Sequence, residues 1–334
     1  MSSINTDLMG PYRFDVFSDP GAVRAEADSA LARYRADVTR FEGSSGEPRI
    51  WLPTLRLAIR TAEHIFATGL DNNIVGRDEE ADLRCDKMSE LSRALNRADA
   101  AARLLEHGAG PEAVAGMRGD VRVAYRTSVD DSDQPFCLFV PLDYDTSKRY
   151  PLMLRLHGMW APEIGEEEWC IKTLEWDREF VRYAPRGSFI ELYPYGRCNE
   201  GYRDAGLRDV LDTMALAQEF FSIDPDRVYI MGSSMGAAGG WRIAAAYPHL
   251  FAAACFVVGV YDQSLAGKVK GLPVMFHYGG KDGAERVTSP QETAALLRKL
   301  GGTAEVIGHP DSGHRLETTD YQLSYYKFFA KHSK

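Results

Sequence analysis

Short β-rich runs alternate with helical stretches along the chain after residue 120, which leaves few folds open. The runs with strand character are Val121 to Thr127, Phe136 to Pro141, Leu152 to Leu156, Phe189 to Tyr193, Val228 to Met231, Ala253 to Val258, Val274 to Tyr278 and Ala304 to Ile307. The first two are spaced to pair as an antiparallel hairpin. The alternation predicts an α/β fold with a mostly parallel twisted sheet and helices on both faces, whose ligands bind beyond the carboxyl ends of the strands.

The part of the chain before this pattern is different. From Pro20 to His107 it is rich in Ala, Leu, Arg and Glu, and Leu91, Leu95, Ala98 and Ala102 follow helical spacing. Glycine-containing breaks divide it into about three helices. We therefore expect a helical segment over residues 1–118 and an α/β domain over residues 119–334. The helical segment is a candidate for a cap, a packing layer or a homo-oligomer interface.

Composition excludes several classes of protein. With 39 basic and 48 acidic residues, the formal charge of −9 repels nucleic acid and anionic lipid. The first 20 residues have no signal-peptide pattern, and no run of 18 apolar residues occurs, so we expect a soluble, cytoplasmic protein without a membrane partner. The five cysteines are scattered and fit no metal or redox motif. We expect reduced thiols, no metal and no cofactor.

The residues Gly232-Ser233-Ser234-Met235-Gly236 carry the strongest chemical signal. They follow an apolar strand and precede a stretch of Ala and Gly that suits a closely packed helix. In a strand–elbow–helix turn the nucleophile adopts strained backbone geometry, and side chains two positions away on either side would collide. The glycines therefore have a mechanical reason, and Ser234 is the candidate nucleophile.

A serine hydroxyl needs a base, and the base needs a carboxylate that orients it. In folds with this elbow the acid and then the base follow the serine in the chain. His314, in the loop after the last predicted strand, is the candidate base, and His309 is the alternative. Asp282, in the glycine-flanked turn after the strand Val274 to Tyr278, is the candidate acid. The other candidate acids are Asp262, Asp311 and Glu285.

Acyl hydrolysis also needs donors for the developing oxyanion. The backbone N–H of Met235, directly after the nucleophile, is one candidate. The second is expected in the loop His157-Gly158-Met159-Trp160 that follows the strand Leu152 to Leu156. Met159 is the candidate there and Trp160 the alternative, while His157 is interpreted as a residue that braces the loop.

These features together resemble the α/β-hydrolase superfamily. The runs Arg227 to Gly232, Tyr247-Pro248 and Phe251 to Ala253 are similar to those of esterases related to feruloyl esterases, polyhydroxybutyrate depolymerases and the catalytic domain of prolyl oligopeptidase. The resemblance covers Val121 to Lys334. It implies a metal-independent serine mechanism through an acyl-enzyme, with the nucleophile, acid, base and oxyanion roles on the residues already named. Met159 and Trp160 stand where the subgroup commonly has glycines, and the propeller of the oligopeptidases is absent.

The loop Tyr193 to Arg203 follows a predicted strand and is expected to line the substrate pocket. Arg197 and Arg203 are candidate ligands for a carboxylate or a sugar. Tyr202 and Trp160 are candidates for stacking on an aromatic acyl group. For both arginines, ion pairing with surface acids is the competing interpretation.

The leading hypothesis for function is hydrolysis of a carboxylic ester of a small molecule. Acyl transfer and peptide or amide cleavage use the same residues and are the enzymatic alternatives. A binding or assembly protein without turnover is the alternative from another class.

Overall fold

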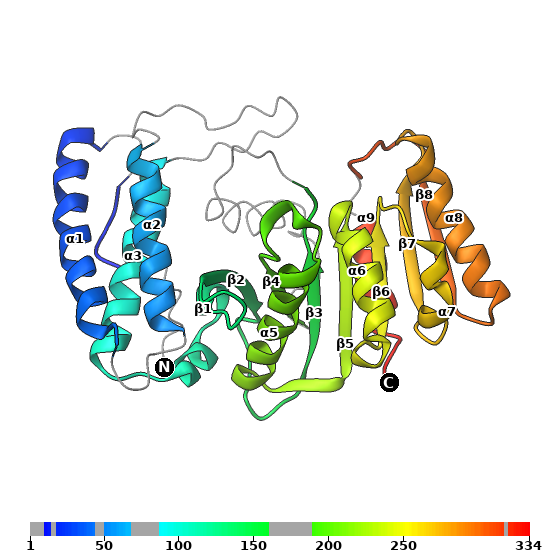
Figure 1. The fold of residues 1–334 in the computed structure, drawn as a ribbon, viewed down its shortest axis with the longest axis horizontal. Helices are drawn as coiled ribbons and strands as arrows, with labels where there is room; N and C mark the ends of the chain where they lie inside the picture. The colour runs from blue at the N-terminus through cyan, green and yellow to red at the C-terminus, as the bar shows by residue number, and fades with distance from the viewer. Residues whose placement is uncertain (1–9, 15–17, 44–49, 68–86, 160–188, 317–319) are drawn as a thin grey trace. The chain divides into compact units, whose positions relative to one another are not determined.

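The computed structural model describes residues 10–14, 18–43, 50–67, 87–159, 189–316 and 320–334. It divides the chain into two compact units, Met1–Pro135 and Phe136–Lys334 (Figure 1). The division falls within strand β2 (Asp133–Val140).

The first unit contains the predicted helices. These are α1 (Pro20–Phe41), α2 (Trp51–Ala67) and α3 (Lys87–Glu106), followed by the short 3₁₀ helix η1 (Pro111–Gly116) and strand β1 (Gly119–Arg126). Helix α1 begins where Asp19 caps it by accepting the backbone N–H of Ala22 at 2.8 Å. The positions that suggested a helix in the sequence, from Leu91 to Ala102, lie on the buried side of α3. The prediction of a helical N-terminal segment is confirmed.

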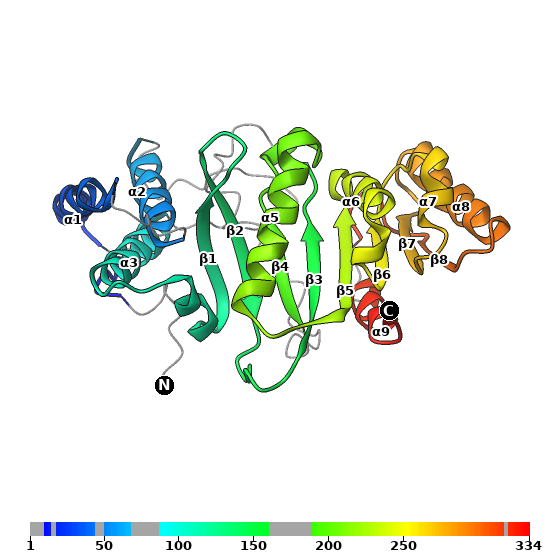
Figure 2. The same ribbon diagram turned by 60° about the horizontal axis from the view of Figure 1, so that its bottom comes forward.

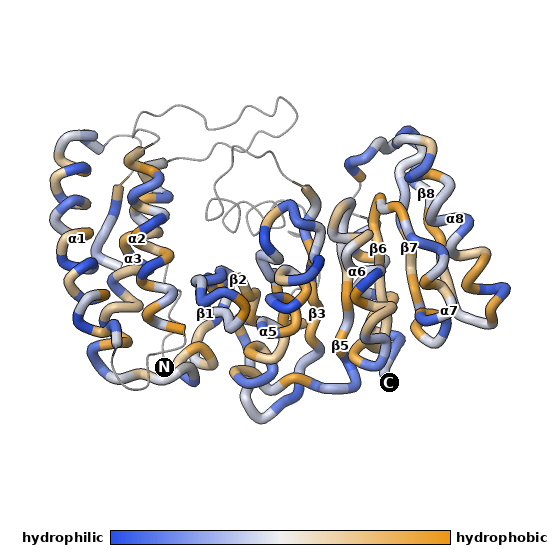
Figure 3. Tube along the Cα trace, in the orientation of Figure 1, coloured by the Kyte–Doolittle hydropathy of each residue, from blue (hydrophilic) through white to orange (hydrophobic). Residues whose placement is uncertain are grey.

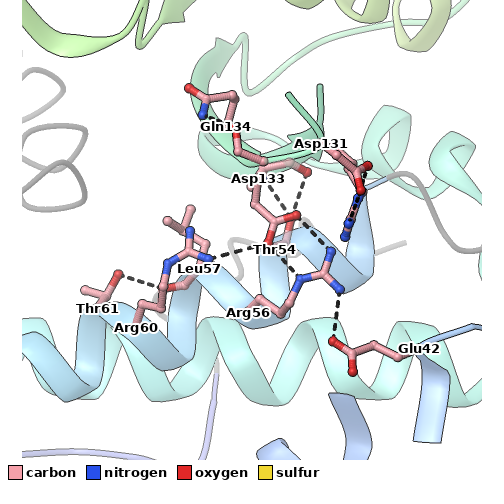
Figure 4. A network of polar contacts seen from close by, with 12 residues as sticks. Glu42, Thr54, Arg56, Leu57, Arg60, Thr61, Asp131, Asp133 and Gln134 are labelled. Atoms are coloured by element: carbon pink, nitrogen blue, oxygen red, sulfur yellow. Dashed lines mark hydrogen bonds and ion pairs between the residues drawn. The ribbon is translucent and has the colours of Figure 1, made fainter. Parts of the chain in front are cut away.

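Polar contacts fix helix α2 against the β1–β2 hairpin (Figure 4). Arg56 donates two hydrogen bonds to the Asp133 carboxylate, at 2.7 and 2.8 Å. The Thr54 hydroxyl accepts the backbone N–H of Ala124 at 2.9 Å. Fork-shaped pairing between a guanidinium and a carboxylate fixes orientation as well as distance, so these contacts fix how α2 lies along the hairpin.

The second unit holds the rest of the sheet. Its strands are β3 (Tyr150–Leu156), β4 (Ile190–Pro194), β5 (Ile223–Ser233), β6 (Ala253–Val257), β7 (Val274–Gly279) and β8 (Ala304–His309). Its helices are α5 (Asp204–Phe220), α6 (Met235–Ala246), α7 (Ala266–Val269), α8 (Ala284–Lys299) and α9 (Asp320–Phe329), with 3₁₀ turns η3 (Cys198–Glu200), η4 (Pro248–Leu250) and η5 (Gln263–Leu265). Every strand predicted from the sequence is present, with bounds that differ by a few residues.

In the described part of the chain the strands form one sheet, in the order β1-β2-β4-β3-β5-β6-β7-β8. The pairs β3–β4, β3–β5, β5–β6, β6–β7 and β7–β8 are parallel, whereas β2 pairs with β4 in the antiparallel sense. The prediction of a mostly parallel sheet is confirmed. Because β5, β7 and β8 run the same way, the loops that follow them lie at the same edge.

Helices cover both faces of this sheet (Figure 2). On one face Trp241 of α6 packs against Phe256 of β6 and Phe276 of β7. On the other face Phe329 of α9 stacks on Tyr229 of β5, with ring centroids 4.7 Å apart. Figure 3 shows hydrophobic residues concentrated along β5, β6 and β7, as expected for strands buried on both faces. Among the described helices, none is both long and apolar enough to span a membrane.

A buried ion pair lies within the α9 face of the sheet. Arg155 of β3 is 3.2 Å from the carboxylate of Glu191 of β4, which is 0% exposed. The hydroxyls of Tyr193 and Tyr326 both donate to this carboxylate, and Arg155 also donates to Tyr325 at 3.1 Å. Burial and the Glu191 charge together raise the pKa of Tyr326, so its hydroxyl stays a donor. A buried charge of this kind is tolerated only because each partner is hydrogen-bonded.

Two histidines are buried at the carboxyl ends of strands. His277 lies in β7 and is 0% exposed, and His157 follows β3. Burial lowers the pKa of His277 to about 3, with a further contribution from His309. Burial also lowers the pKa of His157 to about 4, although two backbone carbonyls at its ring oppose the shift. Both rings are therefore neutral at physiological pH.

The Arg155–Glu191 pair leads to a prediction about stability. Arg155→Met should lower the free energy of unfolding by about 3–5 kcal/mol, because it leaves a buried carboxylate without its counter-charge. Adding Glu191→Gln removes that charge and keeps an acceptor for the tyrosines, so the double variant should recover much of the loss. Urea unfolding followed by circular dichroism measures both. A double variant no more stable than Arg155→Met would contradict this interpretation.

The neutral histidines predict a loss of stability in acid. Below pH 6.5 the unfolded chain protonates His157 and His277, whereas the folded chain keeps these two rings neutral. The free energy of unfolding should therefore fall as the pH drops from about 6.5 to about 4 for His157 and about 3 for His277. Each histidine contributes a slope of at most about 1.4 kcal/mol per pH unit. Urea unfolding at successive pH values tests this. His277→Asn should have a shallower slope than the parent, and an equal slope would refute the assignment.

Candidate active site

The elbow after β5 has the strained geometry expected from the sequence. Ser234 has φ 54° and ψ −113°, values that a residue with a side chain rarely adopts. Its backbone N–H donates to the carbonyl of Val257 at 2.9 Å, and helix α6 begins at the next residue. A Cβ on Gly232 would lie 2.2 Å from the carbonyl oxygen of Gly236, and one on Gly236 would lie 2.2 Å from that of Leu156. The close approach of these backbones therefore requires both glycines.

The structure brings the three predicted polar side chains together. His314 Nε2 is 2.9 Å from Ser234 Oγ, and His314 Nδ1 is 2.7 Å from Asp282 Oδ2. The Asp282 carboxylate is 5% exposed and the imidazole is 45% exposed. Because Asp282 accepts at Nδ1, the neutral ring carries its proton there and presents Nε2 as an acceptor to the serine. The ring thus lies between the hydroxyl and the carboxylate, with the correct tautomer for a base.

Three of the alternative residues, His309, Asp262 and Asp311, contact other groups. The Nε2 atom of His309 lies 3.0 Å from Nδ1 of His277. Asp262 caps η5 by accepting from the backbone N–H and the hydroxyl of Ser264. Asp311 is exposed and pairs with Lys281 at 3.4 Å. Glu285 lies in the first turn of α8.

The loop after β3 passes close to Ser234. A Cβ added to Gly158 would lie 3.4 Å from Ser234 Cβ, so this backbone is in contact range of the serine. Met159, the next residue, has a side chain that is 67% exposed. On the other side, Met235 is the first residue of α6, where backbone N–H groups have no partner within the helix. Trp160, the alternative donor and stacking residue, lies outside the described residues.

His157 braces this loop rather than facing the serine. Its Nδ1 is 2.7 Å from the carbonyl oxygen of Gly158 and its Nε2 is 2.8 Å from that of Tyr195. Tyr202 donates its hydroxyl to the His157 carbonyl at 3.3 Å, and the two rings lie edge to face. The imidazole therefore lies between the backbones of the loops that follow β3 and β4, and as a neutral ring it donates to one of these two carbonyls.

The proposed substrate-binding residues have different surroundings in the structure. Tyr202 is only 1% exposed and packs beneath the His157 loop, so it cannot stack on a substrate as expected. The sequence did not reveal this because its backbone enters the core with φ 58°, in a loop without periodicity. Arg197 donates to the carboxylate of Asp209 in α5. This is an ion pair, as in the competing interpretation, but with a buried acid rather than a surface acid. Arg203 is exposed and occupies the N-cap position of α5 without a side-chain capping hydrogen bond, and its role as a ligand remains a prediction.

Two features of the site were not identified from the sequence. Arg286, in the first turn of α8, is 3.8 Å from Asp282 Oδ1, and the same oxygen accepts the backbone N–H of Gly283 at 2.7 Å. The spacing of four residues at a helix start was a usable signal for this pair. The contact between His277 and His309 depends on the β7–β8 register, which the sequence does not supply.

Comparison with known proteins adds to this geometry. The model of the dienelactone hydrolase family matches residues 195–333, a range that includes Ser234, Asp282 and His314. No curated protein matches the sequence significantly.

Many solved structures are similar. A thermostable esterase superposes with a TM-score of 0.52 at 22% identity, over 64% of this chain and 63% of that one. A putative dipeptidyl aminopeptidase IV from Bacteroides ovatus superposes with a TM-score of 0.53 at 12% identity, over 64% of this chain and 36% of that one. A ferulic acid esterase superposes with a TM-score of 0.50 at 15% identity, over 64% of this chain and 97% of that one. The match thus spans less than two thirds of the first two proteins.

At these identities the likeness concerns the fold. The sheet with helices on both faces is consistent with the fold of these neighbours and with the family match. The chain therefore has the α/β-hydrolase fold, preceded by a helical segment.

Proposed function

We propose that this protein is a serine hydrolase that cleaves carboxylic esters through an acyl-enzyme. The observation that carries the proposal is the position of His314, which lies within hydrogen-bond distance of Ser234 Oγ on one side and Asp282 Oδ2 on the other. The match to the dienelactone hydrolase family supports a hydrolase, and the esterases among the fold neighbours favour esters as the first substrates to test.

The reaction follows from the roles of these atoms. His314 Nε2 removes the proton from Ser234 as the hydroxyl oxygen attacks the ester carbonyl. Asp282 stabilises the imidazolium that results, and its own contacts with Gly283 and Arg286 keep the carboxylate in place. His314 then gives the proton to the leaving alcohol. His314 then removes a proton from a water molecule, which attacks the acyl-enzyme carbonyl. The bond to Ser234 breaks, the serine oxygen takes the proton back, and the carboxylic acid is released.

The negative charge on the tetrahedral intermediate needs two donors. We assign them to the backbone N–H groups of Met235 and Met159. Met235 opens helix α6, so its amide also lies at the positive end of the helix dipole. The Met159 assignment is supported by the position of the preceding residue, since a Cβ added to Gly158 would lie 3.4 Å from Ser234 Cβ. Amides held in advance need no reorganisation during the reaction.

Removal of the nucleophile should abolish the activity. Ser234→Ala is expected to lower kcat/KM for p-nitrophenyl acetate by at least about 10⁴-fold and to prevent labelling by a fluorophosphonate probe. The neighbouring Ser233→Ala is the matched control, because it alters the same elbow without removing the attacking oxygen. Labelling of Ser234→Ala at the rate of the unaltered protein would refute the proposal.

The base and the acid can be tested separately. His314→Ala should cost several orders of magnitude in kcat, and Asp282→Asn about 10⁴-fold, because the amide no longer fixes the tautomer of the ring. If His314→Ala kept near-normal turnover, His314 would not be the base, and the role would be assigned to His309. Circular dichroism checks that both variants fold.

A substrate panel separates esters from the alternatives. Aryl, acyl and sugar esters are assayed beside anilides, peptides and an alcohol acceptor. We expect ester kcat/KM to exceed that of the matched anilide by at least about tenfold. Faster anilide or peptide cleavage would make the protein an amidase or peptidase, and transfer to the alcohol would make it an acyltransferase.

A further inference from the structure

Two imidazoles outside the triad meet beneath the loops that carry it. His277 lies in β7 and His309 ends β8, and the register of these parallel strands pairs His277 with Ile307 and Gly279 with His309. The two histidines are therefore diagonal neighbours on the same face of the sheet. His309 Nε2 is 3.0 Å from His277 Nδ1.

The direction of this hydrogen bond follows from its neighbours. Ser324 of α9 donates its hydroxyl to the carbonyl of Tyr321 at 2.6 Å. Its oxygen therefore accepts from His277 Nε2, 3.1 Å away, and Met275 Sδ is a second acceptor 3.2 Å from that nitrogen. The proton of neutral His277 thus lies on Nε2, which leaves Nδ1 as an acceptor. His309 must donate its Nε2–H.

The backbone of His309 joins the acid turn (residues 279–283) to the base loop (residues 310–316). Its carbonyl oxygen accepts the N–H of Gly280 at 2.8 Å and the N–H of Ser312 at 3.1 Å. The carbonyl of Ser312 in turn accepts the N–H of Lys281 at 2.9 Å. One residue thus binds both segments, and Asp282 and His314 each lie within two residues of one of these contacts.

The two segments pack with no space between their backbones. A Cβ on Gly279 would lie 1.9 Å from the carbonyl oxygen of Gly313, and one on Gly280 would lie 2.8 Å from Cα of Pro310. A rotation or shift of His309 therefore displaces the base loop against the acid turn directly. Displacements of about 1 Å in a catalytic geometry cost about 10²-fold in rate.

We propose that His309, fixed by its hydrogen bond to His277, is a positioning residue that sets the geometry of the Asp282–His314 pair. The inference rests on the proposed function, since it concerns how that triad is held. The hydrogen bond to His277 fixes the direction of the His309 side chain and so restrains its backbone. The His309 carbonyl is hydrogen-bonded to both catalytic loops, so their positions depend on this restraint.

A purely structural role makes a different prediction. If the imidazoles only filled space at the end of the sheet, an apolar ring of similar size would serve equally well. An imidazole buried as completely as His277 loses its hydration, and burial lowers its pKa to about 3. This cost is offset only by directional contacts such as those to Ser324 and His309. A positioning role therefore requires the directional hydrogen bond, whereas a purely structural role requires only a side chain of similar volume.

The experiment compares two replacements of His309. His309→Phe keeps a ring and removes the donor, whereas His309→Gln keeps an amide N–H near the position of Nε2. We expect His309→Phe to lower kcat for p-nitrophenyl acetate by about 10- to 100-fold, with KM changed less than about threefold. His309→Gln should recover turnover to within about fivefold of the parent. Active-site titration with the fluorophosphonate normalises each rate to folded, reactive protein. His249→Phe, at an exposed histidine on η4, is the control.

Proton NMR gives a second readout that stability alone would not change. The low-field resonance of the His314 Nδ1 proton is assigned by its loss in His314→Ala. It should shift or broaden in His309→Phe and return in His309→Gln. The inference is overturned if His309→Phe melts at a lower temperature but keeps parental kcat per titrated site and an unshifted resonance. If the parent itself is not labelled by the probe, the proposed function fails instead.

Discussion

The parallel hydrogen-bond ladder through β5, β6, β7 and β8 is the constraint on which the site depends. Parallel pairing sends the carboxyl ends of these strands to one edge, so residues 80 positions apart in the chain, such as Ser234 and His314, come within 2.9 Å. The ladder also fixes the register, because a slip by one residue would move every side chain to the opposite face. His277 and His309 meet only in the observed register.

The strained serine depends on this support. A positive φ at a residue with a side chain costs of order 1–3 kcal/mol and persists only where the surroundings over-determine it. Here the Ser234 N–H is held by the carbonyl of Val257 in the neighbouring strand, and the glycines at 232 and 236 let α6 start directly beneath. The strain is useful for the proposed chemistry because it lifts Oγ out of the sheet edge toward His314.

The sequence predicted the succession of strands and helices and the elbow from local patterns. It predicted Asp282 and His314 from their order along the chain after Ser234 and from their positions in loops that follow strands. Alternating runs mark strands, and glycine spacing marks the elbow. It failed where the answer depends on tertiary contacts. The buried position of Tyr202 and the pairing of Arg197 with Asp209 depend on how one irregular loop folds back on α5, and nothing periodic in that loop reports it. The contact between His277 and His309 likewise requires a register that no single strand encodes.

Imidazoles recur beneath the loops of this site, and two of them, His157 and His277, are buried and neutral. His157 lies between the backbones that follow β3 and β4 and donates to one of them. The ring of His309 is fixed by His277, and its carbonyl accepts from the backbones that follow β7 and β8. An apolar side chain at either position would contribute burial without direction, and a loop packed only by apolar contacts can slide by fractions of an ångström. A neutral imidazole offers one donor and one acceptor at fixed angles. Loops that must hold a backbone amide or a base in place are therefore better fixed by such rings than by larger hydrophobic contacts.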